Sequence, residues 1–377
     1  YLDNGMISYI DDETIESYYQ MIDGLRIAPT DERLHIVYSP LNGTGNVPVR
    51  EMLKRMGNID VDVVAEQEMP DGHFPTCPDP NPEIREAMKL AIEKTIATGA
   101  DMCVATDPDC DRIGAGVRQG DTVTLISGND MGVLLLDYVC SHRKAQKGEN
   151  GVVVKTIVST EMITPICRAY GVGKIDVLTG FKYIGEQIKG FEETGSHTYL
   201  FGFEESYGYL SGTSVRDKDA VNAAVLVCEM AANYKEKGMT LYEALLKLYE
   251  KYGYYRDGVK SMTMKGLEGM ARIQRIMKTF RENTPQELGG YKVVMAKDYQ
   301  TQVFRNLETG EESGSPLPVS DVLHYTLEDG TWVCIRPSGT EPKLKFYIGV
   351  KADGLQAAQD KVDALDADIE AKVAEIA

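Results

Sequence analysis

The chain has 377 residues, of which 43% are apolar and 26% are charged, and its 40 basic and 58 acidic residues give a net charge of −18. At roughly 150 residues per domain, this length predicts two or three domains, each able to bury a core without disulfides or bound metal. The composition excludes the disordered, collagen-like and membrane classes, and the acidic balance disfavours nucleic acid and anionic lipid as partners. An anionic ligand must therefore be held by local cations.

The cysteines and the apolar runs indicate a cytoplasmic protein. The seven cysteines are scattered, and none is in C-x-x-C spacing. Most of them lie within apolar runs, which favours buried, reduced thiols. No apolar run reaches the length of about 18 residues that a membrane span needs, and no signal-peptide pattern opens the sequence. We expect no contact with a membrane.

From about residue 12 the sequence alternates short apolar runs with amphipathic segments. The first group of predicted elements comprises strands over 34–38, 61–64 and 102–105 and helices over 47–56 and from the Pro-rich loop 70–82 to about 98. The same rhythm restarts with a helix over 129–143, a strand over 151–158, a helix from 160, strands over 175–178 and 199–201, and a long helix over 220–235. Apolar strands separated by helices are typical of parallel α/β sheets.

After about residue 255 the pattern changes. The predicted elements there are a segment over 259–264, a helix over 267–281, a polar stretch over 310–318, a hairpin-like pair over 332–336 and 344–350, and a terminal helix whose apolar stripe runs over 355–376. Such a stripe is typical of a helix that packs on a core. We predict an α/β protein with two consecutive three-layer αβα domains with mixed, mostly parallel sheets (1–122 and 123–256) and then a smaller α+β domain (257–377).

Three carboxylates follow the predicted strand over 102–105 in the segment Asp107–Arg112, with sequence DPDCDR. Alternate residues of an extended loop face the same way, so Asp107, Asp109 and Asp111 should converge, and Mg²⁺ would relieve their repulsion. An EF-hand is excluded because Arg112 and Arg118 stand where it needs Gly and Glu. The alternative is an acidic surface turn, which the position at the carboxyl end of a parallel strand disfavours.

Two further polar segments lie in the second predicted domain. The segment Gly202–Gly208, with sequence GFEESYG, offers carboxylates and a hydroxyl that suit hydrogen bonding to sugar hydroxyls, although polar turns end many strands. The segment Arg216–Asp219 mixes charges before a helix, where a solvated first turn capped by Asp219 is an equal alternative.

The segment Arg336–Lys343, with sequence RPSGTEPK, links the hairpin-like pair. A guanidinium, two hydroxyls and backbone N–H groups around a glycine can form a nest for phosphate. Between Arg336 and Lys345 three basic residues stand against one acidic residue in a chain of net charge −18. That local reversal indicates an anionic ligand, with an ordinary β-turn as the alternative. No P-loop, dinucleotide fingerprint or G-x-S-x-G elbow is present.

In this order and spacing, the three loops resemble those of the α-D-phosphohexomutase superfamily of phosphoglucomutases and phosphomannomutases. The segment Asp107–Arg112 resembles the family's metal loop, Glu204–Ser206 its sugar loop and Arg336–Pro342 its phosphate loop. The resemblance extends through the segments Ser39–Gly45, Leu178–Lys182 and Val215–Asp219, and so covers nearly the whole chain. Members have four domains around a cleft, in which a phosphoserine phosphorylates a hexose phosphate and a bisphosphate intermediate returns the other phosphoryl group.

The resemblance implies a role for each matching residue. Asp107, Asp109 and Asp111 would hold Mg²⁺, and Arg112 and Lys218 would serve the transferring phosphoryl group and the cleft. The residues implied to bind substrate are Thr179, Gly180, Glu204, Ser206, Lys218, Arg336, Ser338, Gly339 and Thr340. The implied substrate is a hexose phosphate, glucose 1,6-bisphosphate is the implied activator and intermediate, and the Glu-Glu-Ser form of the sugar loop resembles glucose-preferring members.

One departure concerns the catalytic serine. The family places it in a T-x-S-H-N-P loop, and no Ser-His-Asn-Pro occurs in this sequence. Together with the start at Tyr1, this predicts a chain that holds family domains two to four and lacks the first. We therefore expect no mutase activity from the isolated chain, which a coupled glucose 1-phosphate assay would test.

Other readings stay open from the sequence. Phosphomannomutases, phosphopentomutases and sugar-1,6-bisphosphate synthases of the same family share similar loops. A phosphatase with an aspartate nucleophile is disfavoured because such enzymes have Thr or Val where Asp111 stands. The non-catalytic alternative is a chain that binds only metal and phosphosugar.

Overall fold

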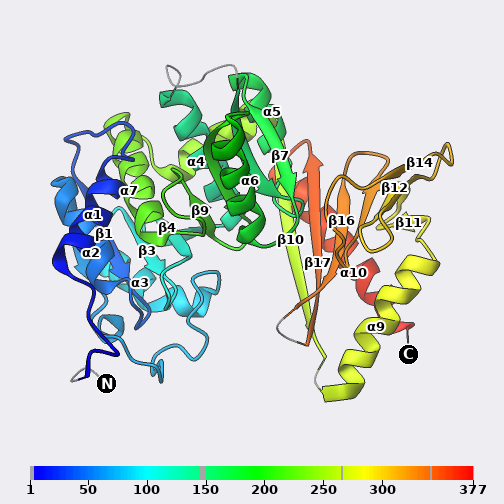
Figure 1. Cartoon of the computed structure of the whole chain (residues 1–377), viewed down its shortest axis with the longest axis horizontal. Helices are drawn as coiled ribbons and strands as arrows, with labels where there is room; N and C mark the ends of the chain where they lie inside the picture. Colours follow the sequence, from blue (N-terminus) through cyan, green and yellow to red (C-terminus); the bar gives the residue numbers. More distant parts are fainter. Residues whose placement is uncertain (1–3, 144–149, 265, 340–341, 377) are drawn as a thin grey trace. The chain divides into compact units, whose positions relative to one another are not determined.

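A computed structural model describes residues 4–143, 150–264, 266–339 and 342–376, and Figure 1 shows the course of the helices and strands. The chain divides into two compact units. The first comprises most of the residues up to Leu246, and the second comprises the residues from Lys247 onward together with the short segments Thr156–Pro165 and Asp176–Thr179.

The first sheet has five strands in the order β2-β1-β3-β4-β5. Their bounds are β1 Leu34–Ser39, β2 Ile59–Val63, β3 Met102–Thr106, β4 Ile113–Gln119 and β5 Thr122–Ile126. Strand β1 pairs in parallel with β2 and β3, whereas β3–β4 and β4–β5 are antiparallel, so the prediction of a mixed sheet is confirmed. Strands β4 and β5 were not predicted, because Gly114 and Gly116 interrupt the apolar pattern of β4.

Helices cover both faces of this sheet. The helices of this part are α1 Asp12–Asp23, α2 Asn46–Met56 and α3 Arg85–Thr98, with a 3₁₀ turn over Ala65–Gln67. On one face, Val37 and Cys103 share a buried cluster with Met88 of α3. The alternate residues Ile36 and Tyr38 point to the other face and are also buried, and β1 contacts helix α7 (Ala220–Glu236). This double burial explains why the parallel strands read as continuous apolar runs.

The second sheet has the order β7-β6-β8-β9, with β6–β8 parallel and β8–β9 antiparallel. Its strands are β6 Gly151–Thr156, β7 Gly173–Val177, β8 Thr198–Glu204 and β9 Gly208–Leu210. The helices in this part of the chain are α4 Gly128–His142, α5 Ile163–Tyr170, α6 Phe181–Thr194, α7 and α8 Leu241–Tyr252. The predicted long helix is α7, which is buried along most of its length and contacts α1, α2, α4 and both sheets.

A buried carboxylate on α7 anchors the segment after α1. Glu229 is 1% exposed and accepts hydrogen bonds from the backbone N–H groups of Ile27 (2.8 Å) and Ala28 (3.0 Å) and from the Tyr138 hydroxyl (2.9 Å). The Arg26 Nε lies 3.2 Å from the same carboxylate. A buried charge that keeps this many partners is tolerated, and removal of one partner is costly. Glu229 therefore fixes α1 and α7 relative to each other.

The C-terminal sheet is antiparallel, in the order β10-β17-β16-β15-β12-β13-β14, with β11 paired to β12. Its strands are β10 Tyr254–Thr263, β11 Glu287–Leu288, β12 Tyr291–Asp298, β13 Val303–Asn306, β14 Glu312–Gly314, β15 Leu323–Leu327, β16 Trp332–Pro337 and β17 Lys343–Ala352. The sequence predicted the β16–β17 pair and missed β12–β15. Helices α9 (Gly266–Glu282) and α10 (Leu355–Ala374) complete this α+β part, and α10 contacts β10 and β17 (Figure 1).

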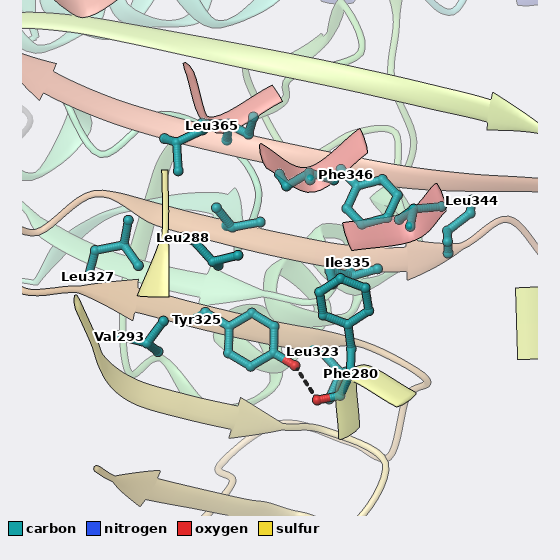
Figure 2. Close-up of a cluster of buried hydrophobic side chains, with 14 of the residues drawn as sticks. Phe280, Leu288, Val293, Leu323, Tyr325, Leu327, Ile335, Leu344, Phe346 and Leu365 are labelled. Atoms are coloured by element: carbon teal, nitrogen blue, oxygen red, sulfur yellow. Dashed lines mark hydrogen bonds between the residues drawn. The ribbon is translucent and has the colours of Figure 1, made fainter. Parts of the chain in front are cut away.

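The core of this part lies between the sheet and the two helices. Figure 2 shows Ile335 and Phe346 of the central strands close to Phe280 of α9, and the Tyr325 hydroxyl donates a 2.9 Å hydrogen bond to the Phe280 carbonyl oxygen. Leu365 of α10 is fully buried in the same cluster. The prediction that the terminal helix packs on a core is therefore confirmed.

The cysteines lie mostly in the interior, as the apolar runs around them predicted. All seven cysteines are free thiols, and six of them are buried, while Cys110 is partly exposed. Within the part of the chain that the structure describes, every helix is too short or too polar to cross a lipid bilayer.

Candidate functional site

The loop after β3 gathers three carboxylates. One carboxylate oxygen of each of Asp107, Asp109 and Asp111 lies within 4.8 Å of the others. The expectation of an extended loop is wrong: the Cys110 N–H donates to the Asp107 carbonyl oxygen (3.0 Å), and Cys110 is left-handed with φ +61°. The Asp107 carboxylate closes this turn by accepting from the N–H groups of Asp111 (3.0 Å) and Arg112 (2.9 Å). We call residues 107–111 the acidic loop.

The turn after β1 supports the acidic loop from the side. The N–H and hydroxyl of Thr44 both donate to the Pro108 carbonyl oxygen, at 2.8 Å and 3.0 Å. A Cβ atom on Gly43 would lie 2.4 Å from the Cα of Pro108, so only glycine fits there. The end of the segment Ser39–Gly45 therefore holds the acidic loop in place.

Electrostatic repulsion within the acidic loop is high. Asp107 is 8% exposed, and burial, followed by the charges of Asp111 and Asp109, raises its pKa to about 7. A cation among the three carboxylates would offset both the cost of burying the Asp107 charge and the repulsion from Asp109 and Asp111. Oxygen ligands of this kind suit a hard cation such as Mg²⁺.

Two cationic side chains border the acidic loop. The Lys218 Nζ lies 2.7 Å from an oxygen of Asp111, and its side chain is 12% exposed. The Arg112 guanidinium lies 3.7 Å from Asp107 and from Asp111. The structure thus brings together residues that stand more than a hundred positions apart in sequence.

Glu83 is a site residue that the sequence did not reveal. Its carboxylate accepts a 3.2 Å hydrogen bond from Arg112. Glu83 lies just before α3, in no motif, and 29 residues separate it from Arg112. No local pattern signals such a contact, because it depends on how the long loop before α3 folds back.

The loop after β8 adjoins the acidic loop. The backbone N–H of Ile113, two residues after the acidic loop, donates to the Tyr207 carbonyl oxygen (3.1 Å). Glu204 is 5% exposed and accepts a 2.8 Å hydrogen bond from the Gly180 N–H, where Gly180 has φ +123°. Burial, followed by the charge of Glu205, raises the pKa of Glu204 to about 7.

Ser206 and Thr179 were also predicted from the sequence as site residues. Ser206 is partly exposed, and the buried hydroxyl oxygen of Thr179 has no hydrogen-bond partner among the described residues. A buried polar atom without a protein partner is costly unless water or a ligand satisfies it.

The raised pKa of Glu204 predicts a pH-dependent stability. Its pKa is 4.5 in the unfolded chain and about 7 in the folded chain, so the folded state binds the extra proton between these values. The stabilisation is complete below about pH 4.5 and is lost as the pH rises through about 7. We expect Glu204→Gln, which can still accept from Gly180, to raise the urea midpoint relative to wild type more at about pH 8 than at about pH 5. Equal differences at both pH values would contradict the assignment.

An open pocket of about 640 Å³ lies over the acidic loop and the start of α7. Its lining residues are Tyr18, Thr44, Pro48, Asp109, Cys110, Asp111, Val215, Arg216, Asp217, Lys218, Asp219 and Val221. In the segment 216–219, Asp219 is buried and caps α7 by accepting from the Asn222 N–H (2.9 Å), and Lys218 faces Asp111. Arg216 instead pairs with Glu192.

The segment after β16 belongs to the second compact unit. Arg336 and Ser338 are partly exposed and Gly339 is exposed. The Ser338 N–H donates to the Lys343 carbonyl oxygen (2.8 Å), and Arg336 pairs in register with Lys345. Arg336 makes no ion pair with any residue that the structure describes. Thr340 lies outside the described residues.

Two mixed α/β sheets with polar loops at the carboxyl ends of their strands, followed by an antiparallel sheet packed with helices, define a multidomain α/β protein. Family models of phosphoglucomutase/phosphomannomutase α/β/α domain II, α/β/α domain III and C-terminal domain match residues 16–120, 127–252 and 265–367. The chain belongs to the phosphoglucomutase/phosphomannomutase family, within the α-D-phosphohexomutase superfamily.

Curated relatives and solved structures agree with this family. The chain is 35% identical to a Staphylococcus aureus phosphoglucomutase over 333 residues (88% of this chain and 59% of the relative) and 35% identical to one from Staphylococcus haemolyticus over 347 residues (92% and 62%). It therefore spans about three fifths of the length of these relatives.

Two crystal structures share its fold. One is a phosphoglucomutase/phosphomannomutase family protein from Burkholderia thailandensis (TM-score 0.61, 19% identity, 94% of this chain and 64% of that chain). The other is the Paramecium parafusin, a phosphoglucomutase, in its open form (TM-score 0.63, 16% identity, 96% and 62%).

Proposed function

We propose that the chain supplies the metal, sugar and distal-phosphate sites of a phosphohexomutase that interconverts glucose 1-phosphate and glucose 6-phosphate. In this reaction a phosphoserine donates its phosphoryl group to the substrate, and the bisphosphate then returns the other one. The acidic loop and its two bordering cations support the proposal, because phosphoryl transfer needs opposite charges gathered at one point. The sequence contains no Ser-His-Asn-Pro, so the serine would lie outside it.

The acidic loop fits a magnesium ion. Asp107, Asp109 and Asp111 offer three hard oxygen ligands within 4.8 Å of one another, and their mutual repulsion needs a cation. Mg²⁺ bound there would neutralise charge on the phosphoryl oxygens during transfer. Because Lys218 pairs with Asp111, a bound cation would compete for that carboxylate and leave the ammonium group available to the substrate.

Arg112 is proposed to stabilise the transferring phosphoryl group. Its guanidinium has donors that suit phosphate oxygens. The contact with Glu83 holds this side chain beside the acidic loop before substrate binds. Phosphoryl transfer depends mainly on positioning and charge neutralisation, which these residues provide.

Glu204 and Ser206 are proposed to bind sugar hydroxyls. Glu204 keeps its second carboxylate oxygen beyond the one that Gly180 occupies, and this oxygen can accept from a hydroxyl group. Thr179 and Gly180 would line the same part of the cleft, and the buried Thr179 hydroxyl without a partner among the described residues supports a ligand contact.

Arg336 is proposed to hold the phosphate that does not react, with Ser338, Gly339 and Thr340. A guanidinium with no ion-pair partner among the described residues is available to an anion. The loop's excess of basic residues attracts phosphate in a chain that is otherwise strongly acidic.

Calorimetry with glucose 1,6-bisphosphate and Mg²⁺ tests the proposal. We expect the wild-type chain to bind the bisphosphate weakly and not to bind free glucose, because phosphate contacts dominate. Absence of bisphosphate binding would contradict the proposed sites. Mannose, ribose and N-acetylglucosamine phosphates in the same experiment would rank the alternative substrates of the family, and binding without turnover is the expected behaviour of the isolated chain.

A further inference from the structure

We propose that Tyr18 is a positioning residue whose hydroxyl, through Asp219, fixes Lys218 against the acidic loop. The Tyr18 hydroxyl lies 3.0 Å and 2.9 Å from the two carboxylate oxygens of Asp219. Tyr18 is on α1 and Asp219 is the N-cap of α7, 201 residues later in the sequence. No motif in the sequence points to Tyr18.

Asp219 stands at the centre of a short chain of contacts. It is 7% exposed, and it accepts from Tyr18 and from the Asn222 N–H (2.9 Å). The residue after it, Ala220, donates its N–H to the Cys110 carbonyl oxygen (3.1 Å). The residue before it, Lys218, reaches Asp111 at 2.7 Å. The residues on both sides of Asp219 therefore contact the acidic loop, Lys218 through its side chain and Ala220 through its backbone N–H.

Helix α1 provides a fixed anchor for the hydroxyl. Glu229 holds the segment after α1 against α7 through Ile27 and Ala28. On its other side α1 is tied to α2, where Arg55 bonds both carboxylate oxygens of Glu16 (2.9 Å and 2.8 Å). Because α1 is held on both sides, the Tyr18 hydroxyl stays in place, and its hydrogen bonds keep the Asp219 carboxylate from rotating. Tyr18 also lines the pocket over the acidic loop.

The consequence concerns a single ammonium group. A hydrogen bond to a charged carboxylate is among the stronger ones in proteins. Without it Asp219 can turn, and the backbone on either side of it gains freedom. The Lys218 side chain, now 12% exposed, then samples positions away from Asp111. The expected effect on phosphosugar binding rests on the proposed function, because the contact between Lys218 and a phosphosugar is part of that proposal.

Amine labelling of the chain under fixed conditions, followed residue by residue by mass spectrometry, tests the proposal. We expect Tyr18→Phe to raise the labelling rate of Lys218 about threefold or more, because loss of the hydrogen bond to Asp219 makes the Lys218 side chain more mobile. Exposed Lys54 should keep its rate, and the thermal midpoint should change little. Tyr18→Phe should also weaken glucose 1,6-bisphosphate binding severalfold.

Tyr19→Phe is the matched control. Tyr19 is the next residue, and its ring lies under Arg55 (4.7 Å) without a hydrogen bond from its hydroxyl to any described residue. Tyr19→Phe should leave Lys218 labelling unchanged, whereas Asp219→Asn, which keeps the helix cap but leaves Tyr18 only a neutral partner, should raise it less than Tyr18→Phe does. An unchanged Lys218 rate in Tyr18→Phe, or an equal rise at every lysine, would overturn the proposal. Failure of the wild type to bind the bisphosphate would overturn the proposed function but not the positioning of Lys218.

Discussion

Replacing Asp109 with asparagine should weaken Mg²⁺ binding by at least about 100-fold, because residues that merely orient a ligand already cost 10- to 100-fold. Asp109 is the exposed member of the three carboxylates, and it is not one of the groups that close the turn. Its replacement by asparagine therefore exchanges a charged ligand for a weaker neutral one without unfolding the loop. Asp107 is less suitable, since its carboxylate holds the N–H groups of Asp111 and Arg112. Magnesium titration by calorimetry gives the affinity.

Asp121→Asn is the control for this experiment. Asp121 is exposed in the turn between β4 and β5 and has the same charge. The substitution changes the net charge by one, as Asp109→Asn does, so any general electrostatic effect appears in both variants. Equal magnesium affinity in Asp109→Asn and Asp121→Asn would refute a cation site at the acidic loop.

Replacing Arg336 with alanine should lower the affinity for glucose 1,6-bisphosphate by roughly 30- to 100-fold, the value of one or two charge-assisted hydrogen bonds. Arg336 makes no ion pair with any described residue, so its removal leaves no buried carboxylate behind. The affinity of Arg336→Lys should lie between those of the wild type and Arg336→Ala, because an ammonium group keeps the charge and loses the paired donors. The measurement is calorimetry in the presence of Mg²⁺.

Arg256→Ala serves as the control for Arg336. Arg256 is an exposed residue of β10 in the same sheet, and its Nε donates to Gln359 (2.8 Å). The substitution Arg256→Ala removes one positive charge, as Arg336→Ala does, but outside the phosphate loop. If both variants bind the bisphosphate as the wild type does, the phosphate-loop assignment is wrong.

Local patterns predicted the parts of the fold that are repeated along the chain. The parallel strands β1 and β3 and the helix α7 are long apolar runs, which carry their own signal. Strand β4 was missed because its glycines interrupt the apolar pattern, although its residues 113–117 pair with β3. In the C-terminal sheet, β12 was missed because its half-buried residues mix polar and apolar types, and β15 was missed because it is short and holds His324 and Thr326 among its apolar residues. Their pairing is decided by neighbours distant in sequence.

Some residues of the candidate site could likewise be predicted from a local sequence pattern, whereas others could not. The D-x-D-x-D spacing signals the acidic loop, but not that Cys110 must turn left-handed to bring the carboxylates together. The basic excess around Arg336 is visible in the composition. Glu83 and Tyr18 carry no signal, since each contacts the site across a long stretch of chain. Conformation and long-range contacts required the structure.

The measurement that tests the account most directly is a crystal structure of the chain grown with Mn²⁺ and glucose 1,6-bisphosphate. The account predicts an anomalous peak among Asp107, Asp109 and Asp111 and a bisphosphate with one phosphate on Arg336. Sugar hydroxyls should lie at Glu204 and Ser206. Manganese bound elsewhere, or a bisphosphate that contacts neither Arg336 nor Glu204, would contradict it.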